Sequence, residues 1–239
     1  MHVALSAVAG LLAGPLIHHV AVQAGADLPF GVGAGVCRRC GAPNSLLASC
    51  SSCGLRITRA IATALVTSIL SGLIAMALGP VWVLIPYLGF AAMTVALFLT
   101  DVDHKRIPNR ITYPGTPLLA GLLMLGAVAD GTLSSFPRAL LGALAYAGFF
   151  GMVYLVARGG FGFGDVKLAV SLGLFTGFLG WDRLLLAGMA TAAVGGLVAL
   201  AAVLGGSARA KSEIPYGPPM IVGTWISIIG GERLVQMLL

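Results

Sequence analysis

The stretch Gly89-Phe-Ala-Ala-Met-Thr-Val-Ala-Leu-Phe-Leu-Thr100 contains no charged residue, and Asp101-Val-Asp103 follows it directly. The same pattern extends outward from this stretch, because long apolar segments alternate with short polar ones along the chain. Of the 239 residues, 58% are apolar and only 9% are charged, whereas a soluble domain carries about 25% charged residues. So few charges leave too little polar surface to face water. The sequence therefore predicts a chain that lies mostly in lipid.

Eight apolar segments meet or approach the length of about 20 residues that a helix needs to cross a bilayer. They are residues 3–22, 60–79, 81–100, 112–129, 138–157, 166–180, 184–205 and 217–238. No basic segment precedes the first of them, so we expect it to be retained as a helix and not removed as a signal peptide. We predict an all-α polytopic membrane protein, a bundle of about eight transmembrane helices. It divides into a first transmembrane helix (1–26), a soluble loop (27–59) and a membrane core (60–239).

The basic residues predict how this bundle is oriented. If the loop 27–59 is cytoplasmic, eleven of the 14 Lys and Arg residues lie on its side of the membrane, and only Arg138, Arg183 and Arg233 lie opposite. Basic residues favour the cytoplasmic side, so we expect both termini outside the cytoplasm. A short sixth segment that failed to cross would instead send the C-terminus inward. The net charge of +6 is interpreted as this topology signal, and no nucleic-acid partner is expected.

The loop contains all four cysteines of the chain, as two Cys-x-x-Cys pairs: Cys37 with Cys40, and Cys50 with Cys53. Two such pairs offer four thiolates to one tetrahedral Zn²⁺, an arrangement that leaves no coordination position open for catalysis. A cytoplasmic location disfavours disulfides. The pattern therefore indicates a structural zinc loop. Two disulfides, a redox pair and an iron–sulfur cluster are the alternatives.

Three of the eight acidic residues lie where the predicted helices end on the cytoplasmic face. Asp101 and Asp103 close the third segment, and Asp165 opens the sixth. Two facing carboxylates that share one proton act as an acid and a base. They activate water for attack on a peptide carbonyl without a metal. The alternative interpretation is structural: Asp101 and Asp103 form a solvated turn, and Asp165 caps its helix.

Four segments, in order, resemble the type IV prepilin peptidases. Asp101-Val-Asp-His-Lys-Arg-Ile-Pro-Asn109 resembles the D-x-D-x-x-x-x-P-[ND] segment of that family, and Gly162-Phe-Gly-Asp-Val-Lys-Leu168 resembles its GxGD-x-K-L motif. Glu213-Ile-Pro-Tyr-Gly-Pro218 is similar to the P-[FY]-G-P segment before the last helix. The double Cys-x-x-Cys loop is similar to the zinc loop of the longer bacterial members. GxGD alone is shared with other intramembrane aspartyl proteases, but the ordered set is specific.

The resemblance implies that Asp101 and Asp165 are the catalytic pair. Family members with one aspartate in the first motif place it six residues before the isoleucine of Ile-Pro-Asn, which is Ile107 here, and this spacing favours Asp101 over Asp103. Asp103 is then a helper or a polar boundary residue. Lys167 is expected either to steady the charge near Asp165 or to extend toward the membrane surface. The glycines before Asp165 are supporting residues that permit close approach of the substrate backbone or act as a hinge; they are Gly162 and Gly164.

The implied reaction removes a basic leader from prepilins or pseudopilins, at the cytoplasmic face of the bacterial inner membrane, for pilus assembly or type II secretion. Many family members also methylate the new N-terminus with S-adenosylmethionine, although no segment here indicates a site for that cofactor. The family's segment at the end of helix one matches Gly14–Val22 only loosely, and the adjacent His18 and His19 point to different helix faces.

Three other functions compete with this interpretation. An ion transporter would carry its acids inside the spans, whereas here they cluster at one face. A zinc-loop membrane scaffold without activity would tolerate loss of both aspartates. A GxGD protease for other membrane substrates would cleave helical membrane proteins but ignore prepilin leaders.

Overall fold

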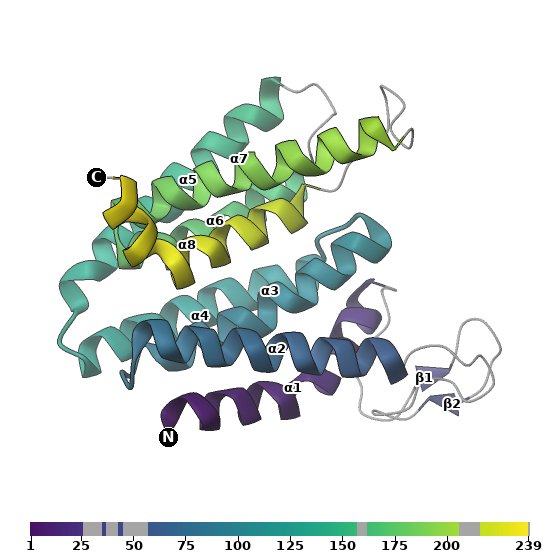
Figure 1. Ribbon diagram of the computed structural model, residues 1–239, viewed down its shortest axis with the longest axis horizontal. Coiled ribbons are helices and arrows are strands. Elements are labelled where there is room, and N and C mark those ends of the chain that lie inside the picture. The colour runs from purple at the N-terminus through teal and green to yellow at the C-terminus, as the bar shows by residue number, and fades with distance from the viewer. Residues whose placement is uncertain (26–34, 37–42, 45–56, 157–161, 206–215, 239) are drawn as a thin grey trace.

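The computed structural model describes residues 1–25, 35–36, 43–44, 57–156, 162–205 and 216–238 (Figure 1). These residues form eight α-helices, one 3-10 turn and one short hairpin. The helices are α1 (His2–Gly25), α2 (Ile57–Leu78), α3 (Leu84–His104), α4 (Asn109–Ala129), α5 (Phe136–Val156), α6 (Phe163–Leu179), α7 (Trp181–Leu204) and α8 (Gly217–Leu238), and the turn η1 (Leu133–Ser135) precedes α5. In the hairpin, β1 (Gly35–Val36) pairs antiparallel with β2 (Pro43–Asn44).

Six segments of the described chain are long and apolar enough to cross a membrane. They comprise α1 to α4, η1 together with α5, and α7. The prediction of an all-α chain with several membrane spans is therefore confirmed. Helix α6 has only 17 residues and is outside this group. Helix α8 is also outside it. The count of about eight spans therefore stays a prediction.

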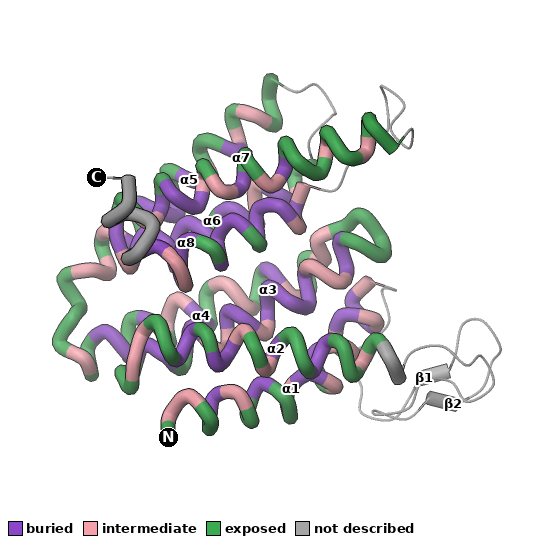
Figure 2. Tube along the Cα trace, in the orientation of Figure 1, coloured by how far each residue is buried: buried purple, intermediate pink, exposed green. Residues whose placement is uncertain are grey.

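The helices form two layers, α1 to α4 in one and α5 to α8 in the other (Figure 1). Contacts of α3 and α2 with α8, and of α4 with α6, join the layers. Buried residues concentrate where the helices face one another, while the outer faces of α1 and α7 are largely exposed (Figure 2). An exposed apolar surface of this extent is expected where lipid is the solvent.

An aromatic and polar cluster ties α3 to α6 and α8 in the core. The rings of Phe90 and Phe175 stack with centroids 4.1 Å apart. The Tyr87 hydroxyl donates to the backbone carbonyl of Phe175 at 2.7 Å, and the indole N–H of Trp225 donates to the Thr94 hydroxyl at 3.1 Å. These contacts hold together the three helices that carry the candidate site.

A sharp turn joins α3 to α4. Lys105 has φ 50° and ψ 40°, a left-handed conformation, and its N–H donates to the Asp101 carbonyl at 2.8 Å. Such a residue is a common helix terminator. Pro108, with an extended backbone, then caps the start of α4. Three residues of the first motif therefore set this geometry: the Asp101 carbonyl accepts from Lys105, Lys105 reverses the chain after α3, and Pro108 precedes α4.

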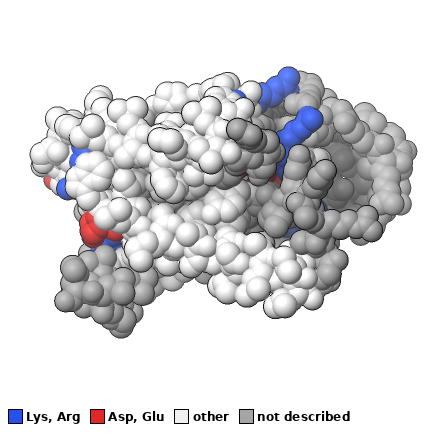
Figure 3. All heavy atoms as spheres, turned by 90° about the horizontal axis from the view of Figure 1, so that it is seen from above, with Lys and Arg blue, Asp and Glu red and all other residues white. Residues whose placement is uncertain are grey.

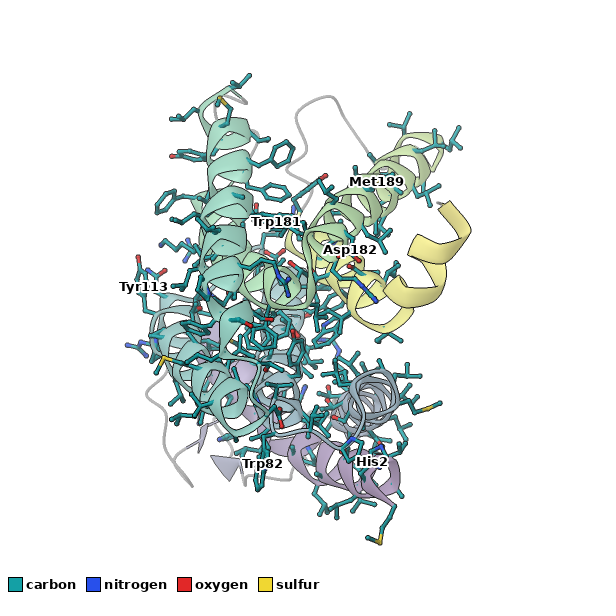
Figure 4. All side chains as sticks on the ribbon, turned by 90° about the vertical axis from the view of Figure 1, so that its left-hand side faces the viewer. His2, Trp82, Tyr113, Trp181, Asp182 and Met189 are labelled. Carbon is teal, nitrogen blue, oxygen red and sulfur yellow. The ribbon has the colours of Figure 1, made fainter. Side chains whose placement is uncertain are left out.

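Charged side chains lie mainly toward the two ends of the molecule, and the middle of the face seen in Figure 3 is almost free of them. Trp82, just before α3, and Trp181, at the start of α7, are exposed (Figure 4), and Trp82 lies at the end of α3 opposite Asp101. Tryptophan is enriched at membrane–water interfaces. This arrangement fits a bundle whose long axis crosses the bilayer.

Candidate active site

Asp101 lies in the last turn of α3 and is 4% exposed. Its Oδ2 atom has no hydrogen-bond partner among the residues that the structure describes. Leaving a buried polar atom unpaired costs free energy, and a carboxylate near the membrane interior is costly as well. Asp101 therefore has an environment that protein folding alone does not favour.

Asp165 lies in the first turn of α6 and is 7% exposed. Helix α6 begins after Gly162, and the backbone N–H of Asp165 donates to the Gly162 carbonyl at 3.1 Å. A Cβ atom on Gly162 would lie 3.4 Å from Oδ2 of Asp165, so the carboxyl folds back over the start of its own helix. This is the position at which an acidic side chain favours a helix N-terminus.

Gly217, the first residue of α8, lies close to both carboxyls. A Cβ atom at this position would be 2.5 Å from Oδ2 of Asp101 and 3.6 Å from Oδ1 of Asp165. The two carboxyl oxygens are therefore at most 6.1 Å apart, the sum of these distances. Two hydrogen bonds of about 2.8 Å through one water molecule span nearly this distance. Residues 64 positions apart thus meet at one place, as the sequence predicted they would if they formed a pair.

Asp103 has a different environment although it is only two residues from Asp101. Residues two apart point to different faces of a helix, and the Asp103 carboxylate forms an exposed ion pair with Arg59 of α2 at 3.0 Å. This position fits the boundary role that the sequence allowed for Asp103, on a face that leads away from Asp165.

The two aspartate motifs pack directly on each other. A Cβ atom on Gly164 would lie 3.1 Å from the Cβ of Ile107, so the glycine lets the turn after Asp101 approach the start of α6. Lys167 donates to the side-chain oxygen of Asn109 at 2.8 Å. This exposed contact gives Lys167 a partner on α4, and both roles expected of Lys167 stay predictions.

Tyr216 completes the wall beside Gly217. Its ring packs on Gly195 of α7, since a Cβ atom there would lie 3.0 Å from the ring. Burial raises the pKa of the Tyr216 phenol, and the charge of Asp165 raises this pKa further. The phenol therefore remains protonated at neutral pH and adds no negative charge to the site.

The structure adds one residue that sequence reasoning missed and leaves one group untested. Gly217 belongs to the segment Glu213–Pro218, which resembles the P-[FY]-G-P segment of the family. Nothing in the sequence indicated that this glycine lies close to both aspartates. Cys37, Cys40, Cys50 and Cys53 lie outside the described residues. His19 donates to or accepts from Gln23, one turn along α1, at 2.8 Å.

Comparison with known proteins decides the family. Residues 88–200 match the type IV leader peptidase family. The prepilin leader peptidase/N-methyltransferase of Bacillus subtilis is 30% identical over 188 residues, which cover 78% of this chain and 73% of that one. The protein of the same name from Aeromonas hydrophila is 29% identical over 207 residues, or 84% of this chain and 64% of that one. This chain belongs to the type IV leader peptidase family.

The resemblance predicted from the motifs is therefore confirmed at the level of the family. This leader peptidase family member spans 64% of the length of the Aeromonas hydrophila relative and 58% of the Aeromonas salmonicida one. No solved structure matches the chain significantly. The family match includes both Asp101 and Asp165.

Proposed function

We propose that this protein is a membrane-embedded aspartyl endopeptidase that removes leader peptides from type IV prepilins or pseudopilins. One observation carries the proposal: Asp101 and Asp165, both buried, approach each other around Gly217. The printed names of the relatives support the substrate class, since they are prepilin leader peptidases.

The chemistry follows from two close carboxyls in a site with little water. One proton is shared between Asp101 and Asp165, so one carboxyl is a base while the other is an acid. The base takes a proton from a water molecule, whose oxygen attacks the carbonyl carbon of the scissile peptide. The acid then protonates the departing amine. Gly217 leaves the space beside both carboxyls free of a side chain.

We further propose that the bundle crosses the bacterial inner membrane about eight times, with α6 and α8 among the spans. Both termini then lie outside the cytoplasm, and the aspartates face the cytoplasm, where a basic leader lies. The placement of the basic residues supports this orientation, as does the location of both aspartates at one end of the bundle.

The loop 27–59 is proposed to bind a structural Zn²⁺ through Cys37, Cys40, Cys50 and Cys53. The first Cys-x-x-Cys pair lies in sequence between β1 and β2, which pair with each other. A bound zinc ion would supply folding energy to the loop. Residues 1–26 and 60–239 form the first span and the peptidase core of the same proposal.

N-methylation of the new N-terminus with S-adenosylmethionine is a second proposed activity. Its support is the name of the relatives, which are leader peptidase/N-methyltransferases. No described residue is assigned to it.

The test is to co-express the protein with a prepilin from the same genome and to determine the pilin N-terminus by mass spectrometry. Asp101→Asn and Asp165→Asn are the active-site variants, and Asp103→Asn is the matched control, because it makes the same change on the exposed side of α3. We expect leader removal by the wild type and by Asp103→Asn only. An added methyl group would demonstrate the second activity.

Other outcomes would redirect the assignment. A wild type that leaves every prepilin intact but cleaves another helical membrane protein would indicate a different intramembrane substrate. Full processing by Asp165→Asn would eliminate an aspartyl mechanism that uses Asp165, whereas a folded wild type that cleaves nothing would favour a scaffold role.

A further inference from the structure

The ammonium group of Lys167 is held from three directions. It donates to Oδ1 of Asn109 at 2.8 Å and lies 5.0 Å from the centre of the Tyr113 ring and 4.8 Å from that of Phe163. Both ring distances fall within the range of cation–π attraction. Phe163 and Lys167 are four residues apart on α6 and share one face, whereas Asp165 lies between them in sequence and faces elsewhere. The ammonium therefore binds α4 and not the carboxyl of Asp165.

Both partners lie in the first residues of α4, shortly after the chain reversal that follows Asp101. Asn109 is the first residue of α4, and Tyr113 lies one turn later on the same face. Tyr113 projects at the edge of the molecule (Figure 4) and is exposed. Two residues before α4 begins, Ile107 packs on Gly164. The segment Ile107–Tyr113 thus docks as a unit on the first turn of α6.

A second polar contact joins α4 to α6 deeper in the bundle, where the Thr116 hydroxyl lies 3.3 Å from that of Ser171. At the start of α6, Lys167 supplies a hydrogen bond to α4 through Asn109. Because Asp165 is in that first turn, any shift of the turn changes its distance from Asp101, and small displacements of catalytic groups lower rates strongly.

We propose that Lys167, gripped by Asn109 and Tyr113, is a positioning residue that holds Asp165 at its working distance from Asp101. This inference rests on the proposed peptidase function. Lys167 touches neither carboxyl in this role and is not a catalytic residue. Its ammonium binds Asn109 and Tyr113 of α4 and so links the segment after Asp101 to the first turn of α6; this link is called the strap.

The kinetic test compares Asn109→Leu, Lys167→Met, their double variant and Asn109→Asp, with purified protein and a prepilin substrate. We expect kcat to fall roughly 10- to 100-fold in each of the first two, with KM nearly unchanged. The double variant should be no slower than the slower single one, because both changes remove one interaction. Asn109→Asp keeps an acceptor oxygen for Lys167 and should retain nearly full activity.

The control is Thr116→Val, which removes a polar contact between the same two helices away from the aspartates; its kcat should match the wild type. A slow Lys167→Met beside a normal Asn109→Leu would overturn the proposal and indicate that the charge acts on Asp165. Additive losses, or an Asn109→Asp variant as slow as Asn109→Leu, would overturn it as well.

Hydrogen exchange at residues 163–168 tests the strap without any substrate. The amides of this first turn of α6 should exchange faster in Asn109→Leu and Lys167→Met than in the wild type, Asn109→Asp or Thr116→Val. Unchanged exchange in both slow variants would overturn the strap even if the wild type cleaves prepilins. A wild type that cleaves no prepilin, with faster exchange in the variants, would instead overturn the peptidase assignment alone.

Discussion

An aspartate lies at each end of helix α3, and the two have opposite surroundings. At the start, the Asp130 carboxylate accepts hydrogen bonds from the backbone N–H groups of Trp82 and Val83, at 2.9 and 2.8 Å. At the other end, Asp101 is buried with an unpaired oxygen and faces a second buried carboxyl across Gly217. The first arrangement satisfies two backbone donors in the turn that precedes α3. The second lowers the stability of the fold, because a buried carboxyl oxygen is left without a hydrogen bond.

These two surroundings separate a structural aspartate from a candidate catalytic one. Both residues are acidic, both adjoin an apolar span, and both are shielded at least in part from water. What distinguishes them is how fully they are paired: Asp130 accepts from two backbone donors, whereas Asp101 leaves Oδ2 unpaired and lies close to a second carboxyl.

Replacing either member of the buried pair should remove activity but not the fold. We expect Asp101→Asn and Asp165→Asn to lower the cleavage rate by about 10²–10⁴-fold, the usual contribution of an acid or base. Thermal unfolding in detergent should occur at the wild-type temperature or higher, because an amide costs less to bury than a carboxylate. A variant that loses both activity and stability would show that the carboxyl supports the fold.

Filling the space between the aspartates should have the next largest effect. Gly217→Ala places a methyl group 2.5 Å from Oδ2 of Asp101, so the carboxyl must move. We expect a loss on the order of 10²-fold in kcat. Gly148→Ala is the matched control, because a Cβ there meets no atom within 4 Å. Equal activity of the two variants, measured by leader removal, would argue against a site around Gly217.

At the other end of α3, Asp130→Ala should affect stability alone. Two backbone donors in the turn before α3 lose their acceptor, and loss of a hydrogen bond costs about 0.5–1.5 kcal/mol. Asn keeps one acceptor oxygen, so Asp130→Asn should be milder. Denaturation in mixed micelles would measure the stability, and activity per folded molecule should not change. A lower cleavage rate per folded molecule in Asp130→Ala would contradict a purely structural role for Asp130.

Asp103→Asn should have the smallest effect. Its ion pair with Arg59 is exposed, with 36% and 53% of the two side chains accessible, and such pairs contribute at most about 1 kcal/mol. We expect wild-type leader removal and a barely altered unfolding transition. A strong loss of activity would give Asp103 the helper role that its motif allows.

The positions of the helices could be predicted from sequence because the apolar segments are long. The predicted segments 81–100 and 112–129 correspond to Leu84–His104 and Asn109–Ala129. The helices extend beyond the apolar residues at the motif, since hydropathy detects the membrane core and not the polar turns that continue a helix past it. Helix α3 therefore continues past Asp101 and Asp103 and ends at His104, just before the left-handed Lys105.

The candidate site was predictable in part. Motif spacing favoured Asp101 over Asp103, and the structure buries the first and exposes the second. The place of Gly217 and the partner of Lys167 were not foreseen, because each depends on a contact between segments far apart in the chain. Neither hydropathy nor local spacing in a single sequence carries that information.

The length of α6 has a consequence of its own. Its 17 residues rise about 26 Å at 1.5 Å per residue, a few Å less than the hydrocarbon layer of about 30 Å. Helix α6, which carries Asp165, is the shortest of the described α-helices. In the proposed topology, in which α6 crosses the bilayer, lipids with longer acyl chains increase the hydrophobic mismatch along this helix. Bilayer thickness would then govern how readily water reaches Asp165.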